Sequence, residues 1–374
     1  MRQVVISGTG VFTPEAVITN AELVESYNAY VDKQNAIHSK EIEAGEQEPM
    51  AHSNEEFIFK ASGIERRHVM DKEGVLNPDV MHPQLRQREI EEPGIMTEMA
   101  VAAALDALAK AGKKPSDVDA VICAASNHER AYPAIAIEIQ EALGIDGFGF
   151  DMNVACSSAT FGIQSAADMI RSGSANCILM VNPEICSGHL EWRDRDCHFI
   201  FGDVCTAVVL EDKSQAKSDT QFEILATRCL TKFSNNIRNN NGFLRRSRPD
   251  GVSDRRDMQF MQNGRQVFKQ VVPIVSDMVI AHCEEEGVDP TKLDRMWLHQ
   301  ANKSMNDFIG RKVLGRVPEP TEQPNILQEY ANTSSAGSII AFSQNSDDLP
   351  IGSLGIICSF GAGYSVGNVI VKRL

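Results

Sequence analysis

Apolar and polar positions follow one arrangement that occurs twice along the chain. Residues 97–111 are rich in alanine at helical spacing, and a turn with glycine and proline separates them from the apolar run 120–123. Residues 267–283 form a second helical pattern, followed by a similar turn and the apolar run 296–298. Because glycine commonly ends a helix and a short apolar run is typical of a buried strand, each arrangement predicts a helix, a turn and a strand.

The spacings inside the two arrangements agree. A glycine precedes a proline by three residues, an aspartate follows the proline by four, and an asparagine follows the aspartate by eight. The residues are Gly112, Pro115, Asp119 and Asn127 in the first copy and Gly287, Pro290, Asp294 and Asn302 in the second. A third match pairs Phe201-Gly202-Asp203 with Phe360-Gly361-Ala362, each ahead of an apolar strand. Three matches in one order predict two copies of an α/β unit.

The polar stretch 213–220 is where we expect the first copy to end. The chain should then consist of a first half over residues 1–212 and a second half over residues 221–374, each with alternating strands and helices in a layered α/β architecture. Residues 21–56 and 71–94 interrupt the first half with polar, irregular sequence. Insertions of that length commonly carry specificity or are flexible.

The composition narrows the class of protein. The 374 residues are 43% hydrophobic and 23% charged, ordinary values for a globular protein. The net charge of −15 argues against a nucleic-acid surface or an anionic membrane as partner. We expect no membrane span and no signal peptide, because no apolar run is long enough. The nine scattered cysteines lack a Cys-x-x-Cys pair, which argues against disulfides and structural zinc and fits a reducing cytoplasm.

A repeated neighbourhood surrounds the first candidate for chemistry. Cys156 lies in Val-Ala-Cys-Ser-Ser-Ala-Thr, and Asn332 occupies the matching place in Tyr-Ala-Asn-Thr-Ser-Ser-Ala. An apolar helical pattern follows Cys156 and ends near Gly173, so the thiol should lie at the amino end of a buried helix. Free amides and the helix dipole there favour a thiolate, which is the nucleophilic form. A small buried cysteine is the alternative interpretation.

Two further candidates follow predicted strands. His299 comes directly after the run 296–298, and residues at the carboxyl ends of strands commonly line the sites of α/β proteins. A histidine there can donate or move a proton near neutral pH. Asn332 can only donate and accept hydrogen bonds, so we expect it to hold an oxyanion or to orient another group. A structural histidine and a turn asparagine are the alternatives, and His68, His128 and His198 are weaker candidates.

The glycine-rich segment 360–364 permits close backbone approach. Its amides could complete an oxyanion hole with the amide of Cys156, although a glycine turn between strands is the simpler interpretation.

Together these motifs resemble the β-ketoacyl-acyl-carrier-protein synthase III family of the thiolase superfamily. The polar insertion after Asn20 is similar to that of its β-ketodecanoyl-acyl-carrier-protein synthase subgroup. The motifs are Ser62–His68, Val154–Thr160, Phe201–Asp203, Met261–Lys269, His299–Asn302 and Asn332–Ser334. The resemblance implies a thiolase-like five-layered αβαβα fold with two internally duplicated halves, and a homodimer. It implies a cytoplasmic acyltransferase of fatty acid synthesis that needs no metal and no cofactor beyond its substrates, acyl-CoA and malonyl-acyl carrier protein.

The family's chemistry is a ping-pong decarboxylative Claisen condensation, and its roles can be carried over by residue. Cys156 would hold the acyl group as a thioester, with the backbone amides of Cys156 and Gly363 around the oxyanion. His299 and Asn332 would donate hydrogen bonds to the enolate that malonyl-acyl carrier protein forms when it loses carbon dioxide. Tyr132 matches the position at which the dimer partner closes the acyl pocket.

The residues expected to contact coenzyme A and the carrier protein differ from those usual in the family. Phe57 replaces the usual tryptophan and would stack on adenine with Arg195, while a usual arginine is replaced by Ala61. The acidic carrier protein would dock on Lys303 or on a basic loop, for which solvated charge is the alternative. The basic loop contains Arg245, Arg246 and Arg248.

We expect octanoyl-CoA rather than acetyl-CoA as the primer, because the insertion resembles that of the β-ketodecanoyl subgroup. The alternatives are a condensing enzyme of secondary metabolism with another acceptor, a Cys-His-Asn hydrolase of papain type, and a non-catalytic acyl-binding relative. The position of Cys156 in the middle of a duplicated chain argues against the papain type. The joint presence of Cys156, His299 and Asn332 argues against a non-catalytic protein.

Overall fold

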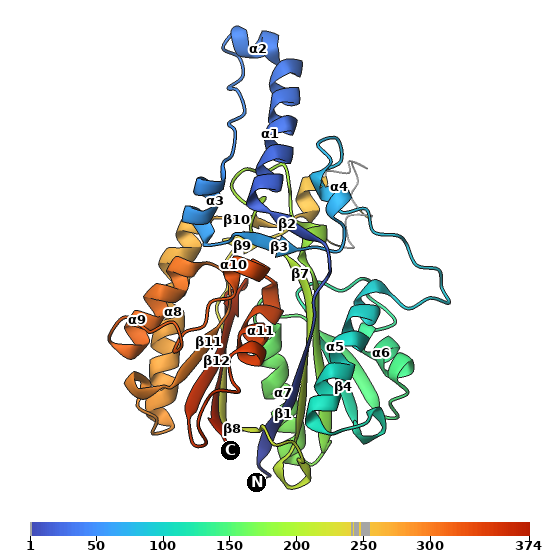
Figure 1. Cartoon of the computed structure of the whole chain (residues 1–374), viewed down its shortest axis with the longest axis vertical. Coiled ribbons are helices and arrows are strands. Elements are labelled where there is room, and N and C mark those ends of the chain that lie inside the picture. The colour runs from blue at the N-terminus through green and yellow to red at the C-terminus, as the bar shows by residue number, and fades with distance from the viewer. Residues whose placement is uncertain (1, 241, 243–246, 248–254) are drawn as a thin grey trace.

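Nine strands form the central sheet of this protein, for which a computed structural model describes residues 2–240, 242, 247 and 255–374 (Figure 1). Their order is β11-β12-β13-β8-β1-β7-β6-β4-β5. The strands of the first half are β1 (Val4–Phe12), β4 (Ala120–Ala124), β5 (Phe148–Met152), β6 (Cys177–Ile185) and β7 (Asp203–Asp212). Those of the second half are β8 (Phe222–Thr231), β11 (Arg295–Leu298), β12 (Leu354–Gly361) and β13 (Ser365–Arg373).

The two halves repeat one strand pattern, which confirms the predicted duplication. In the first half β4 runs parallel to β6, β6 pairs antiparallel with β7, and β7 pairs antiparallel with β1. In the second half β11, β12, β13 and β8 repeat the same order and directions. The two edges of the sheet differ. Strand β5 is added at the edge of the first half and has no counterpart in the second. At the opposite edge, the amide of Met296 in β11 donates to the carbonyl of Glu322 at 2.7 Å. The halves meet where β1 pairs briefly with β8.

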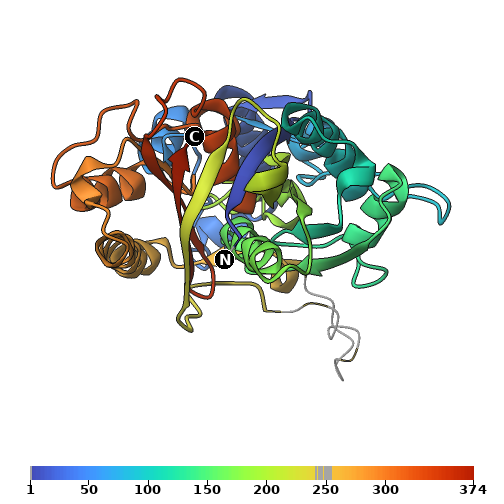
Figure 2. The same ribbon diagram turned by 90° about the horizontal axis from the view of Figure 1, so that it is seen from below.

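Helices on both sides of the two half-sheets produce five layers (Figure 2). Helices α5 (Ile95–Ala111) and α6 (Ile135–Leu143) pack on the outer face of the first half. Helices α8 (Gly264–Glu285) and α9 (Lys303–Leu314) pack on the outer face of the second half. Helices α7 (Ser158–Ser172) and α11 (Gly337–Gln344) lie in the middle layer. Because both faces of the strands are covered, β4, β6 and β7 are apolar and buried along most of their lengths.

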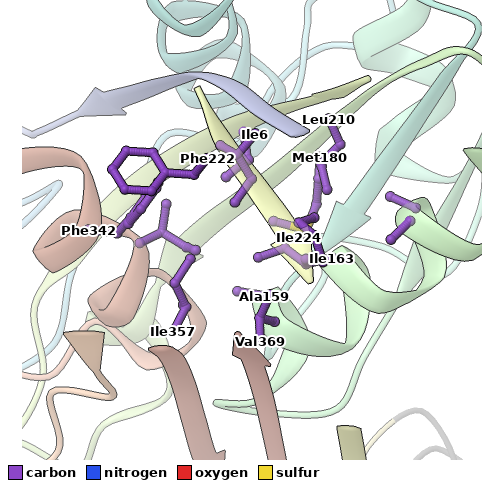
Figure 3. Close-up of a cluster of buried hydrophobic side chains, with 14 of the residues drawn as sticks. Ile6, Ala159, Ile163, Met180, Leu210, Phe222, Ile224, Phe342, Ile357 and Val369 are labelled. Carbon is purple, nitrogen blue, oxygen red and sulfur yellow. The ribbon is translucent and has the colours of Figure 1, made fainter. Parts of the chain in front are cut away.

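The core of the middle layer contains side chains from both halves (Figure 3). Ile163 of α7 and Phe342 of α11 belong to it, together with Ile6 of β1 and Val369 of β13. The Phe342 ring packs on the edge of Phe222, with ring centroids 4.9 Å apart. Burial of each such aromatic or aliphatic side chain contributes about 1.5–3 kcal/mol, so this layer holds the two halves together.

The insertion predicted at 21–56 forms an arm that stands above the sheet in Figure 1. Its helices are α1 (Asn20–Ile37), α2 (Ser39–Glu43) and α3 (Glu55–Ser62). Helix α1 begins with a capping box in which Thr19 and Glu22 satisfy each other's backbone amides. Its first turns pack through Leu23 and Tyr27 on a satellite core, while its last turns are largely exposed.

The shorter elements complete the molecule. They are β2 (Val17–Thr19) with β3 (Arg66–His68), β9 (Ile237–Arg238) with β10 (Met261–Gln262), and the helices α4 (Lys72–Leu76) and α10 (Leu327–Tyr330). Within the described residues, no helix combines the length and the apolar character needed to span a bilayer. The stretch 213–220 joins β7 to β8, but both halves share one sheet and one core, so the division into 1–212 and 221–374 stays a prediction.

Candidate active site

A cavity of about 450 Å³ opens where loops of both halves meet, and Cys156, His299 and Asn332 all line it. This volume is typical of pockets for small organic ligands. Its walls are mainly apolar and aromatic, and they include Phe199, Ile200, Phe201, Phe260, Val267, Phe268 and Val271. The structure therefore brings together three residues that lie far apart in the sequence.

Cys156 lies next to Ser157, the N-cap residue of α7, and so at the amino end of the helix, as the sequence predicts. The residue before it, Ala155, has a φ of 47°, and this left-handed turn carries the chain from β5 into the helix. The end of β12 approaches the thiol closely at Gly361, where an added Cβ would lie 2.6 Å from the Cβ of Cys156. Only glycine fits at this position, which explains part of the glycine-rich segment.

The expected thiolate is not the resting state of this thiol. Burial raises the pKa of Cys156 to about 11, even though a hydrogen bond from Ser334 and the backbone amides of Ala362 and Cys156 lower it. The hydroxyl of Ser334 donates to the sulfur at 3.5 Å. Desolvation thus outweighs the stabilisation at the helix terminus, and the free thiol predominates at neutral pH.

The second backbone amide at the sulfur belongs to Ala362, one residue before the predicted Gly363. Gly363 instead has a φ of 129° and precedes a cis peptide bond to Tyr364, and its carbonyl accepts the amide of Ser234 at 2.5 Å. The contact with the sulfur favours Ala362 over Gly363 as the second donor, and the assignment of Gly363 stays a prediction. The amides that could hold an oxyanion here are those of Cys156 and Ala362.

His299 follows β11, and the backbone holds it on both sides. Its amide donates to the carbonyl of Cys358 at 2.7 Å, and its carbonyl accepts the side-chain amide of Asn306 at 3.0 Å. The imidazole packs edge-on against Phe360. Burial lowers the pKa of His299 to about 3, and a hydrogen bond with the backbone of Ser334 offsets this only in part. The ring is therefore neutral at physiological pH.

The residues after His299 are structural. Gln300 donates to the carbonyl of Leu298 at 2.8 Å and accepts the amide of Ile326 at 3.1 Å. Asn302 caps α9 and donates to the carbonyl of Ala61 at 2.6 Å. This part of the motif therefore holds the strand, the helix and the wall of the cavity in register.

Asn332 is fixed by backbone contacts across the two halves. Its amide donates to the carbonyl of Ile200 at 3.0 Å, and its carbonyl accepts the amide of Gly202 at 3.1 Å. Its side-chain oxygen accepts the amide of Ser334 at 2.9 Å. Because that oxygen is engaged, the NH₂ group is the part of the side chain that can donate to a ligand.

Three polar residues at this site were missed in the sequence analysis. Ser334 contacts the sulfur, and Glu184 makes a buried hydrogen-bond cluster beside it. Arg265 lines the cavity at the start of α8. A charged residue at the end of the otherwise apolar run 177–185 was a usable signal for Glu184, whereas nothing local distinguishes Ser334 from its serine neighbour.

Phe57 and Arg195 lie together, with the guanidinium carbon 4.0 Å from the centre of the Phe57 ring. Arg195 also donates to the carbonyl of His52 at 2.8 Å. Groups at 4.0 Å are in van der Waals contact, so an adenine could enter between them only if the guanidinium moved aside.

Of the remaining predicted residues that the structure describes, Lys303 and Tyr132 lie outside the cavity lining. Lys303 begins α9 near the cavity and pairs with Asp307 at 2.8 Å. Tyr132 is 85% exposed in the loop before α6. The basic-loop residues Arg245, Arg246 and Arg248 are outside the described residues.

One group of residues in the described part of the chain could offer metal ligands. The ligand atoms of Cys123, His128 and Asp151 lie within 4.8 Å of one another. None of the three lines the cavity, and the Asp151 carboxylate already accepts the amides of Ile135 and Ala136 at 2.8 and 2.9 Å. We therefore assign no ion to this group.

Comparison with known proteins identifies two family models in the chain. Residues 150–232 match 3-oxoacyl-[acyl-carrier-protein] synthase III, and residues 283–373 match its C-terminal domain. A β-ketodecanoyl-[acyl-carrier-protein] synthase of Pseudomonas aeruginosa is 55% identical over 350 residues, covering 94% of this chain and 100% of that protein. A β-ketoacyl-[acyl-carrier-protein] synthase III of Bordetella petrii is 29% identical, with 100% and 98% covered.

The fold is also similar to that of solved structures. The 3-oxoacyl-[acyl-carrier-protein] synthase III of Aquifex aeolicus aligns with a TM-score of 0.76 at 24% identity, covering 99% of each chain. The thiolase-like fold predicted from the motifs is thereby confirmed, and the papain-type alternative is wrong. The chain belongs to the 3-oxoacyl-[acyl-carrier-protein] synthase III family, whose members are condensing enzymes of the acyltransferase class.

Proposed function

We propose that this enzyme lengthens a medium-chain acyl group by two carbons, with octanoyl-CoA as primer and malonyl-acyl carrier protein as the second substrate. The observation that carries the proposal is the convergence of Cys156, His299 and Asn332 on one cavity. The 55% identity to a β-ketodecanoyl synthase supports the choice of primer, because octanoyl plus two carbons gives the β-ketodecanoyl group.

Acyl transfer to Cys156 is the first step of this proposal. The sulfur attacks the thioester carbonyl of the acyl-CoA, and the bond from that carbonyl to the coenzyme A sulfur breaks. The thiol proton ends on the departing coenzyme A thiolate, so no net charge accumulates. The amides of Cys156 and Ala362 stabilise the tetrahedral oxyanion, and one such donor is typically worth about 3 kcal/mol of barrier.

Decarboxylation and condensation follow. The bond to the malonyl carboxylate breaks, carbon dioxide leaves, and the electron pair forms an enolate on the carrier-bound thioester. His299 and Asn332 donate hydrogen bonds to that oxygen. The single N–H of the neutral His299 ring then points to the cavity rather than to the backbone of Ser334. The enolate carbon then attacks the acyl carbonyl on Cys156, and the carbon–sulfur bond breaks to release β-ketoacyl-acyl carrier protein. The departing Cys156 thiolate takes up one proton from solvent, which restores the free thiol.

The lining of the cavity offers apolar surface for an acyl chain and a cation for a phosphorylated arm. Phe199, Phe201 and Phe260 are apolar neighbours of the site, which suits a hydrocarbon chain. Arg265 offers a cation to a phosphate of coenzyme A or of the carrier protein's prosthetic arm. Lys303 and the loop with Arg245, Arg246 and Arg248 are the proposed contacts of the acidic carrier surface.

We also propose that the enzyme is a homodimer joined along β5. This edge strand carries the 43% exposed Phe148. Helix α6, which carries the 48% exposed Ile137 and follows the loop with Tyr132, is joined to β5 because the Asp151 carboxylate accepts the amides of Ile135 and Ala136. An exposed edge strand with apolar side chains is suited to pairing with a second copy. Tyr132 of the second copy would then close the acyl pocket. Because all nine cysteines are free, we propose the reducing cytoplasm as its location.

Intact-mass analysis after incubation with acyl-CoAs of increasing length tests the first step. We expect one acyl adduct on Cys156, formed faster from octanoyl-CoA than from acetyl-CoA, and none in the Cys156→Ala variant. Addition of malonyl-acyl carrier protein should then discharge the adduct as β-ketodecanoyl-acyl carrier protein. Faster acylation by acetyl-CoA contradicts the primer, and discharge only by a different acceptor favours an enzyme of secondary metabolism.

A further inference from the structure

Glu184 is a carboxylate buried beside the site, at the carboxyl end of β6. The residue is 1% exposed in a strand whose other side chains are mainly apolar. Among the residues that the structure describes, no lysine or arginine forms an ion pair with it. Burial of an unpaired carboxylate is costly unless hydrogen bonds compensate, so its contacts are informative.

Two serines from the two halves donate all four of the close hydrogen bonds to Glu184. In the first half, the amide and hydroxyl of Ser126 donate at 3.0 and 2.5 Å from the loop after β4. In the second half, the amide of Ser335 donates at 3.2 Å, and its hydroxyl also donates to the carboxylate. One side chain of β6 therefore joins the loop after Asn332 to the first half.

The loop that Glu184 holds is the one that faces the thiol. Ser334 precedes Ser335 directly and donates to the sulfur of Cys156, while Asn332 lines the cavity. Ala331, directly before Asn332, and Ser334, two residues after it, have φ values of 57° and 49°. Non-glycine residues keep such conformations only when surrounding contacts hold them, and Glu184 supplies contacts at the end of this loop.

We propose that Glu184 is a positioning residue for the condensation step, which holds Asn332 and Ser334 over the acylated Cys156 by tying Ser335 to Ser126. The proposal rests on the proposed function, because it takes Asn332 as the donor to the enolate. Glu184 itself does not line the cavity, whereas Cys156, His299 and Asn332 do. Its effect should therefore appear more strongly in condensation, which needs Asn332, than in acylation.

The charge of Glu184 links this contact to pH. Burial raises the pKa of Glu184 to about 7, although the hydrogen bonds of Ser126 and Ser335 lower it. The other titratable groups around it are thiols with raised pKa values: Cys123 of β4, Cys156 before α7, Cys186 after β6 and Cys205 of β7. Only the carboxylate accepts all four bonds. As the pH falls through 7 the carboxylate gains a proton and becomes the carboxylic acid. One serine then loses its acceptor, and condensation should slow.

Glu184→Gln tests the proposal, because glutamine keeps the size but cannot accept all four bonds. We expect acylation of Cys156 by octanoyl-CoA to change less than about threefold, and discharge by malonyl-acyl carrier protein to slow about 10- to 100-fold, as a small misplacement allows. The KM for malonyl-acyl carrier protein should stay constant while kcat falls. The decline of the wild-type condensation rate below pH 7 should be absent in the variant.

Asp119→Asn is the matched control. Glu184 of β6 is bonded to Ser126 just after β4, and Asp119 joins β4 and β6 at the opposite end of these strands. It accepts the amides of Asn176 and Cys177 at 2.6 and 3.1 Å, away from the thiol. Both half-reactions should change by the same factor in this variant. If Glu184→Gln behaves like the control, or keeps the wild-type pH profile, Glu184 has only a structural role and the proposal is wrong.

Ser335→Ala keeps the proposal testable if Glu184→Gln does not fold. This substitution removes one hydroxyl from the cluster. We expect the condensation rate to fall severalfold while the acylation rate is retained. An equal fall in both rates overturns the proposal. The proposed function is judged separately, on the wild-type enzyme: if the wild type shows no acyl adduct on Cys156, that function fails whatever the variants do.

Discussion

Two opposing effects act on the thiol of Cys156. The helix terminus and the neighbouring hydrogen bonds favour a thiolate, whereas burial in an apolar cavity favours the thiol, and burial dominates. The neighbouring His299 is kept neutral by the same desolvation. The free site is therefore uncharged at these two residues, which suits the entry of an apolar acyl chain.

Alkylation of the free enzyme should follow this raised pKa. Because the pKa of Cys156 is about 11, the thiolate fraction rises about tenfold per pH unit below it. We expect the rate of iodoacetamide modification at Cys156, followed by peptide mass spectrometry, to increase steadily from pH 6 to 9. A modification rate that levels off within this range would falsify the dominance of burial. It would show that Cys156 is already a thiolate near neutral pH.

Removal of the Asn332 side chain should separate the two half-reactions. We expect Asn332→Ala to lower the condensation rate about 100-fold, since one donor to the developing oxyanion is lost. Acylation of Cys156 by octanoyl-CoA should remain within severalfold of wild type and serves as the internal control. Both rates are measured by single-turnover mass spectrometry. An equal fall in the acylation and condensation rates would contradict the role of Asn332 as a donor to the enolate.

At the scale of elements, close approach of three segments builds the site. The helix α7 presents Cys156, the end of β12 supplies the turn with Ala362, and β11 presents His299. These segments can meet because Gly361 has no side chain between β12 and the nucleophile. Secondary structure alone places each of these residues at the end of an element. The packing of the elements then sets the distances between the residues.

A methyl group at Gly361 should therefore disrupt the site more than it disrupts the fold. Its Cβ would lie 2.6 Å from the Cβ of Cys156, so the helix start or the turn must shift. We expect Gly361→Ala to slow acylation about 100-fold, as displacements of about 1 Å can. Gly188→Ala is the control, because its nearest neighbour would lie 3.9 Å away and its rate should match wild type. Similar rates for both variants contradict the prediction.

At the scale of the whole molecule, duplication creates two equivalent half-sheets with different edges. The first half ends at β5, which is incompletely buried, whereas the second ends at β11, which is fully buried. Only the first edge therefore offers a surface for a second copy. The proposed closure of the acyl pocket by Tyr132 depends on that surface.

Charge on this edge should disrupt the dimer. We expect Phe148→Lys to give a monomer by light scattering, because a lysine there would be buried without a partner in the interface. Acylation by octanoyl-CoA should weaken as Tyr132 of the second copy is lost. Ile351→Lys alters a side chain that is 82% exposed in a turn of the second half, and it should remain dimeric. A dimeric Phe148→Lys protein places the interface elsewhere.

Spacing along the sequence predicted the duplicated α/β architecture and placed Cys156, His299 and Asn332 at the ends of predicted elements, while the resemblance of the motifs indicated the family. Periodicity and spacing are local properties, so they survive in a one-dimensional pattern. The ionisation of Cys156, the amide of Ala362 at its sulfur and the cluster at Glu184 become visible only in the tertiary structure. Burial, peptide orientation and contacts between residues such as Glu184 and Ser335 depend on segments that the sequence separates widely.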